Sequence, residues 1–126
     1  MALILLIDDD HDMRSTLRRI LTNAGHTVVE AGNGSDGLRR VAEDRPALVI
    51  TDILMPGMDG IETIQCLTGA HPGLRVIAMT GGGRYHGFEY LDVARALGAH
   101  ALLNKPFRAE TLLETVRGLL PPSPRA

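Results

Sequence analysis

The sequence predicts an α/β domain in which helices cover both faces of a five-stranded parallel sheet. With 126 residues, 44% of them hydrophobic, the chain is large enough for one domain with one sheet-centred core. Short apolar runs, typical of strands buried on both faces, alternate along the chain with segments of helical period. Such alternation is the pattern of a parallel sheet with helical crossovers.

Five segments have the length and composition of strands. Four are strongly apolar, and a weaker one, residues 27–30, is predicted to be the second strand. The four apolar segments are residues 2–7, 47–51, 74–79 and 101–103.

Segments with a helical period separate and follow the strands. The first places Met13, Leu17 and Leu21 on one face and ends at Gly25, the residue type that commonly follows a helix. The other predicted helices are residues 34–44, 58–70, 90–97 and 109–119. The proline-rich residues 120–126 cannot continue a helix, so we expect one domain over residues 2–119 and then a tail or linker.

Charge and composition exclude several classes of function. The net charge is −2 and no basic block is present, so nucleic acid is not an expected direct partner. The apolar run at residues 1–7 is too short to span a bilayer, which predicts a cytoplasmic protein that makes no membrane contact. Cys66 is the only cysteine, so an intrachain disulfide is impossible, and the five dispersed histidines do not have metal-ligand spacing.

Polar residues cluster where the predicted strands end. In an open parallel sheet, ligands bind at the carboxyl ends of the strands, so these residues should share one crevice. Lys105, which follows the fifth strand, is the only lysine among thirteen basic residues. The others are Asp8, Asp9 and Asp10 after the first strand, Asp52 after the third, and Thr80 with Gly81 after the fourth.

Together these groups predict phosphoryl chemistry. Like charges on Asp8, Asp9 and Asp52 require protons or a cation, and hard oxygen ligands suit Mg2+. Beside such an ion and Lys105, the Asp52 carboxylate could attack a phosphoryl group and form an aspartyl phosphate. Thr80 would donate a hydrogen bond to a phosphoryl oxygen, and the glycines from Gly81 would let the backbone approach closely.

Each residue also has an ordinary structural interpretation. Asp10 is better explained as the cap of the first helix, and Asp52 could begin a turn. Thr80 could simply end a strand, and the glycines after it could form a loose loop. The position of all these residues at one edge of the sheet nevertheless favours a site.

Four motifs, in order, resemble the receiver domain of two-component response regulators over about residues 2–119. They are LLIDDDHDMR, VITDILMPGMDGIE, VIAMTGG and NKPF. The resemblance implies a flavodoxin-like sheet with strand order 2-1-3-4-5 and five helices. It implies a signalling domain that is phosphorylated by a histidine kinase or histidine phosphotransfer protein and then switches a protein-interaction surface. Such a domain is not a metabolic enzyme, although it can hydrolyse its own phosphoryl group.

By similarity, Asp52 is the phosphoacceptor and Lys105 contacts the phosphoryl group, with a cis peptide bond expected before Pro106. Thr80 supplies the switch hydroxyl. The resemblance assigns Mg2+ to Asp52, Asp9, Asp8 through a water molecule, and the backbone carbonyl of Leu54.

Two features depart from the family pattern. Leu102 occupies the position where receivers usually carry an aromatic switch residue. The segment between Thr80 and Lys105 is a few residues longer than is typical and holds Tyr85, Phe88 and Tyr90. These rings either replace the missing aromatic residue in the output or only pack the loop against the fourth helix. The resemblance also suggests a homodimer through the face between the fourth and fifth helices, and leaves the downstream protein partner unidentified.

Three other functions would also use residues of this kind. A Mg2+-dependent phosphatase of the haloacid dehalogenase type would need a second aspartate two residues after the nucleophile, where this chain has Leu54. A flavodoxin-like FMN-binding module is compatible with the topology, but three acids at the first strand end would repel the flavin phosphate. A degenerate receiver is disfavoured because every expected site residue is present.

Overall fold

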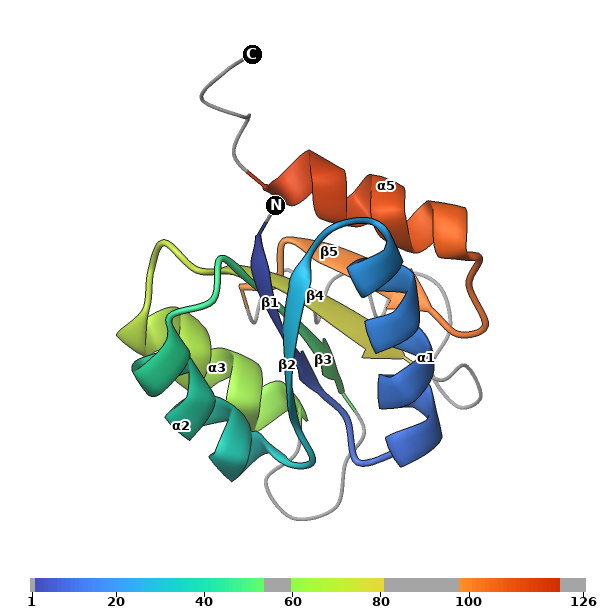
Figure 1. The fold of residues 1–126 in the computed structure, drawn as a ribbon. Helices are drawn as coiled ribbons and strands as arrows, with labels where there is room; N and C mark the ends of the chain where they lie inside the picture. The colour runs from blue at the N-terminus through green and yellow to red at the C-terminus, as the bar shows by residue number, and fades with distance from the viewer. Residues whose placement is uncertain (1, 54–59, 81–97, 121–126) are drawn as a thin grey trace.

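The computed structural model describes residues 2–53, 60–80 and 98–120 and shows an α/β fold (Figure 1). Its five parallel strands lie in the order β2-β1-β3-β4-β5, as expected from the resemblance. The strands are β1 (Leu3–Ile7), β2 (Thr27–Ala31), β3 (Leu48–Asp52), β4 (Arg75–Thr80) and β5 (Ala101–Asn104). The described helices are α1 (His11–Asn23), α2 (Gly34–Asp44), α3 (Gly60–Ala70) and α5 (Ala109–Leu119).

The strand ends differ slightly from the predicted ones. Both β3 and β4 extend one residue beyond the prediction, so that Asp52 and Thr80 are the last residues of their strands. β5 likewise extends to Asn104. The predicted fourth helix at residues 90–97 lies outside the described residues, as do residues 58–59 of the predicted third helix and residues 121–126 of the tail.

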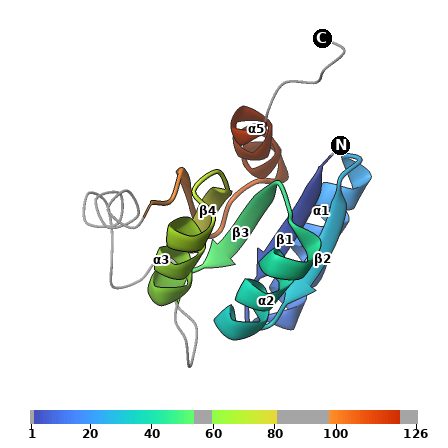
Figure 2. The same ribbon diagram turned by 90° about the vertical axis from the view of Figure 1, so that its left-hand side faces the viewer.

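Two separate hydrophobic clusters hold the helices against the sheet. α1 and α5 cover one face, and α2 and α3 cover the other (Figures 1 and 2). In β1, alternate residues serve opposite clusters: Leu5 and Ile7 pack toward α2 and α3, while Ile4 and Leu6 pack toward α1 and α5. This burial on both faces explains the unbroken apolar sequence of β1.

Local signals fix both ends of α1. The Asp10 side chain accepts hydrogen bonds from the amides of Asp12, at 3.0 Å, and Met13, at 3.2 Å, so Asp10 is the helix cap expected from the sequence. At the other end Gly25 has φ 99°, a left-handed conformation that glycine adopts without strain. The His26 amide then donates to the Leu21 carbonyl, which closes the helix.

Cys66 and Phe107, the latter from the NKPF motif, can be placed in the fold. Cys66 is exposed on α3, and Phe107 is half-buried against the cluster between the sheet and the α1 and α5 helices. Among the described residues, no helix is both long enough and apolar enough to cross a bilayer.

Candidate functional site

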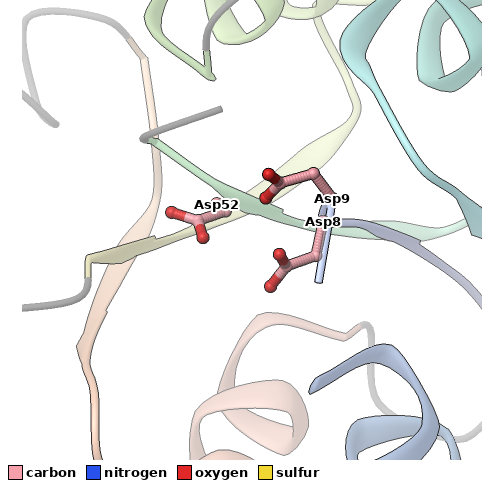
Figure 3. A group of neighbouring side chains, drawn as sticks. All are labelled: Asp8, Asp9 and Asp52. Carbon is pink, nitrogen blue, oxygen red and sulfur yellow. The ribbon is translucent and has the colours of Figure 1, made fainter. Parts of the chain in front are cut away.

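Three carboxylates meet at the carboxyl edge of the sheet. Asp8 and Asp9 follow β1, and Asp52 ends the neighbouring strand β3. One oxygen from each carboxylate lies within 4.8 Å of the others, and the three side chains gather beyond the ends of β1 and β3 (Figure 3). Asp8 and Asp52 are buried, whereas Asp9 is exposed. The cluster therefore has a buried base and an opening to solvent.

Lys105 places its ammonium between the two buried acids. Its Nζ atom lies 2.9 Å from Asp52 Oδ2 and 3.2 Å from Asp8 Oδ2. The cis peptide bond between Lys105 and Pro106 directly follows β5, two strands from β3 in the sheet. One compact cation thus contacts carboxylates that come from two different strands.

Burial and charge set the protonation of the cluster. Burial raises the pKa of Asp8 and the charge of Asp52 adds to the rise, while the Asp10 amide and Lys105 oppose it. Burial also works against the charge of Lys105, but the hydrogen bonds and charges of Asp52 and Asp8 outweigh it and raise the pKa of Lys105. Lys105 therefore stays protonated at neutral pH, and its ammonium is shared by the two buried acids.

The donor set fits a hard divalent cation. The three carboxylates supply only oxygen ligands, and the single ammonium balances only one of their three charges. The opening at Asp9 leaves space for water or for the oxygens of a substrate. Mg2+ prefers this combination of a few carboxylates with additional oxygen ligands.

Three hydrogen bonds fix the turn that carries Asp8. Its Oδ1 atom accepts from the Asp10 amide at 2.9 Å, and its own amide donates to the Ala31 carbonyl at 3.1 Å. The Arg14 guanidinium donates to the Asp8 carbonyl at 2.7 Å through an Nη atom. Main chain and side chain of Asp8 are thus both held.

Arg14 is a site-supporting residue that the sequence reasoning missed. Its Nε atom lies 3.1 Å from Glu30 Oε1, and Arg18 lies 2.6 Å from the other Glu30 oxygen. Burial would raise the pKa of Glu30, but the hydrogen bonds and charges of the two arginines outweigh it and lower that pKa. In the sequence, this ion pair is indicated only by a basic residue, Arg14, in the first turn of the predicted first helix and by an acidic residue, Glu30, in the weaker second strand.

Thr80 lies beside the acidic cluster and has a definite partner. It is fully buried at the end of β4, and its hydroxyl donates to Asn104 Oδ1 at 3.1 Å. Its carbonyl accepts from the Lys105 amide at 2.7 Å. Asn104 was not among the predicted site residues.

The structure thus brings together most of the predicted site. Asp8, Asp9, Asp52 and Lys105 share one cluster, with Thr80 ending the strand next to β3. Leu102 is half-buried on β5 and packs toward the cluster of α2 and α3. Leu54, Gly81 and the loop aromatics Tyr85, Phe88 and Tyr90 lie outside the described residues.

Comparisons with known proteins agree on one family. The family model of the response regulator receiver domain matches residues 4–117. The chain is 33% identical over 118 residues to sporulation initiation phosphotransferase F of Bacillus subtilis, covering 94% of this chain and 93% of that protein. It is 38% identical over 117 residues to response regulator MprA of Mycobacterium tuberculosis, covering 93% of this chain and 50% of that protein.

Solved structures show the same fold. The chemotaxis protein CheY4 of Vibrio cholerae superimposes with a TM-score of 0.87 at 30% identity, covering 95% of this chain and 99% of that one. A CheY-like receiver domain protein of Methanospirillum hungatei superimposes with a TM-score of 0.85 at 29% identity, covering 94% and 92% of the two chains.

Proposed function

Because this chain belongs to the response regulator receiver domain family, we propose that Asp52 accepts the phosphoryl group through which the domain signals. The observation that carries this assignment is the contact between Asp52 and Lys105 inside a cluster of three acids. A carboxylate held against an ammonium, beside a site for a divalent cation, is arranged for transfer of a phosphoryl group to itself. The domain is a signalling module and not a metabolic enzyme.

In the proposed transfer, Asp52 is the nucleophile and the neighbouring groups neutralise charge. An Asp52 oxygen attacks the phosphorus atom, an O–P bond forms, and the bond from phosphorus to the donor breaks, with its electron pair returning to the donor. Lys105 neutralises charge on the phosphoryl oxygens, and Thr80 donates a hydrogen bond to one of them. Mg2+, held by Asp9, Asp52, Asp8 through water, and the Leu54 carbonyl, would neutralise further charge on those oxygens.

The family and the relatives support the proposed donor. Response regulators are phosphorylated by histidine kinases, so we assign a histidine kinase or histidine phosphotransfer protein as the donor. The name of the Bacillus relative, a phosphotransferase, supports phosphoryl exchange with a partner protein. The chain spans about half the length of response regulator MprA, so the function of that whole protein is not transferred to it. We propose only that the receiver domain contacts a downstream protein.

We extend the proposal to the domain limits and the finer properties. Residues 2–119 form the receiver, which includes a fourth helix at residues 90–97, and residues 120–126 form a tail or linker. In this proposal the Gly81 backbone would approach the phosphoryl group, and a homodimer would form through the face between the fourth and fifth helices. Hydrolysis of the phosphoryl group by the domain itself returns it to the resting state.

The rival functions are less well supported. Membership of the receiver family favours phosphoacceptor signalling over a haloacid-dehalogenase-type phosphatase and over an FMN-binding module. The three acids that would repel a flavin phosphate do meet at the carboxyl edge of the sheet. Steady hydrolysis of a phosphate ester, abolished in Asp52→Asn, would favour the phosphatase instead.

One experiment tests the assignment of Asp52. The protein is incubated with acetyl phosphate and Mg2+, and its intact mass is measured before and after treatment with hydroxylamine. The wild type should gain one phosphoryl group that hydroxylamine removes, as expected for an acyl phosphate.

Two variants complete that experiment. Asp52→Asn should gain no such group, because it lacks the nucleophile. Asp10→Asn is the matched control: Asp10 is an exposed helix cap outside the cluster, asparagine caps equally well, and the variant should be phosphorylated like the wild type. A hydroxylamine-labile adduct that persists in Asp52→Asn would contradict the proposal.

A further inference from the structure

The hydroxyl of Thr80 is already engaged in the structure. Thr80 and Asn104 are register partners at the ends of β4 and β5, and the hydroxyl donates to Asn104 Oδ1 at 3.1 Å. Thr80 is fully buried, whereas Asn104 is exposed. The bond therefore joins a donor that has no access to water to an acceptor that has such access.

A threonine hydroxyl has only one proton to donate. In the proposed function Thr80 must give that proton to a phosphoryl oxygen, and it cannot then donate to Asn104. We propose that Asn104 is a positioning residue that holds the Thr80 hydroxyl in the unphosphorylated state and competes with the phosphoryl group for its proton. This inference rests on the proposed role of Asp52.

Loss of the hydrogen bond between Thr80 and Asn104 is costly for the buried Thr80 hydroxyl but not for the exposed Asn104 carbonyl. When the bond breaks, the Asn104 carbonyl can be solvated by water, so its loss costs little. The buried Thr80 hydroxyl has no such compensation and must find another acceptor, since an unpaired buried donor is costly. A phosphoryl oxygen on Asp52 would be that acceptor, and Asn104 would then be released.

The backbone connects this exchange to the acidic cluster. The Lys105 amide donates to the Thr80 carbonyl at 2.7 Å, and the Lys105 ammonium lies 2.9 Å from Asp52. A single stretch of β5 thus carries both the cation that contacts the phosphoacceptor and the side chain that holds the switch hydroxyl. Movement of Lys105 toward an added phosphoryl group would act directly on the neighbouring Asn104.

Asn104 also bears on the missing aromatic residue of β5. Side chains two residues apart on a strand share a face, so Asn104 lies on the same face as Leu102. Its register partner on the neighbouring strand β4 is Thr80. Leu102 has no polar group that could form a hydrogen bond with the Thr80 hydroxyl, whereas Asn104 accepts a hydrogen bond from it. In this chain the released amide of Asn104 is therefore the group on β5 that reports the state of Thr80.

The test measures binding of beryllium fluoride, a phosphoryl analogue, in the presence of Mg2+, by titration monitored through backbone amide shifts. Asn104→Ala should bind roughly two- to tenfold more tightly than the wild type, because the competing hydrogen bond is absent. Without ligand, the Thr80 amide signal of this variant should already be displaced toward its position in the bound wild type. Asn23→Ala, which removes an exposed asparagine at the end of α1, should match the wild type in both measurements.

A double-mutant cycle isolates the contact. In a Thr80→Val background there is no hydroxyl to hold, so adding Asn104→Ala should change the affinity less than twofold. Thermal melts confirm that each variant is folded. Failure of the wild type to bind beryllium fluoride would overturn the proposed function itself. Normal binding by the wild type, with unchanged affinity and an unmoved Thr80 signal in Asn104→Ala, would overturn only the role of Asn104.

Discussion

The Nζ atom of Lys105 lies 2.9 Å from Asp52 Oδ2, although 53 residues separate the two in the chain. The same ammonium contacts Asp8, which is 97 residues away. The fold thus brings the only lysine of the chain into contact with the two buried acids of the cluster.

Lys105→Arg should slow phosphorylation roughly tenfold or more, even though the positive charge is kept. The wide guanidinium cannot take the place of a compact ammonium that contacts both Asp8 and Asp52. The initial rate of adduct formation from acetyl phosphate, followed by intact mass, measures the effect. Arg108→Lys, at an exposed position before α5, is the control and should react like the wild type. Equal rates in Lys105→Arg and the wild type would show that charge alone suffices.

Arg14→Lys should weaken Mg2+ binding roughly tenfold, because residues that orient metal ligands commonly have effects of this size. Arg14 holds the Asp8 carbonyl and Glu30 together, and a lysine cannot make both contacts in the same geometry. Calorimetric titration with Mg2+ is the measurement. Arg18→Lys is the matched control, since Arg18 contacts Glu30 from a more exposed position and contributes nothing to Asp8. An equal loss in both variants would argue against a specific role for Arg14.

Two histidines make the same contact at the amino edge of the sheet. His26 Nδ1 accepts from the Ala2 amide at 3.3 Å, and His100 Nδ1 accepts from the Val76 amide at 3.1 Å. Burial lowers the pKa of both rings, aided by the charge of the amino terminus for His26 and of Arg75 for His100. Each ring must be unprotonated at Nδ1 to act as an acceptor.

Stability should therefore fall as the pH drops through the unfolded histidine value of 6.5 toward the lower folded values. Below 6.5 the unfolded chain binds protons that the folded chain does not, whereas above it neither state does. Urea unfolding between pH 8 and pH 5.5 measures the slope. The double variant His26→Gln, His100→Gln should show a shallower slope, and the contribution of the acids cancels in this comparison. Identical slopes would refute the assignment.

Gly37→Ala should destabilise the domain by about 1 to 3 kcal/mol, the usual cost of overpacking a core. A Cβ atom at Gly37 on α2 would collide with the buried side chain of Ile7. Gly69→Ala on α3 is the matched control, since its Cβ would meet nothing within 4 Å. That substitution should stabilise by roughly 0.5 to 1 kcal/mol from helix propensity. Urea unfolding measures both, and a stabilised Gly37→Ala would contradict the packing described for α2.

The elements and the main site residues could be predicted because they depend on order along the chain. Strand ends fall at one edge of a parallel sheet whatever the side-chain details, so Asp8, Asp9, Asp52 and Lys105 could be grouped in advance. The Asp10 cap and the Gly25 terminus depend on local chemistry and were equally accessible.

The supporting contacts could not be predicted because they depend on register and rotamer. The pairing of Thr80 with Asn104 requires knowing which residue of β5 lies opposite the last residue of β4. The bridge from Arg14 to Glu30 similarly requires the position of α1 relative to β2. Single-residue extensions of β3, β4 and β5 beyond the predicted ends show how far the sequence falls short of that precision.

Because of the strand order, the two halves of the site should differ in their resistance to local unfolding. Asp8 and Asp9 follow β1 and Asp52 ends β3, and these two strands are each flanked by strands on both sides, whereas Lys105 follows β5, which has one neighbour in the described sheet. Hydrogen exchange should therefore reach the amides of β1 and β3 only through global unfolding, but those of β5 through smaller openings. Local opening of β5 would then withdraw the Lys105 ammonium from the carboxylates while β1 and β3 stay folded, so the ion pairs of the site could break and re-form without global unfolding.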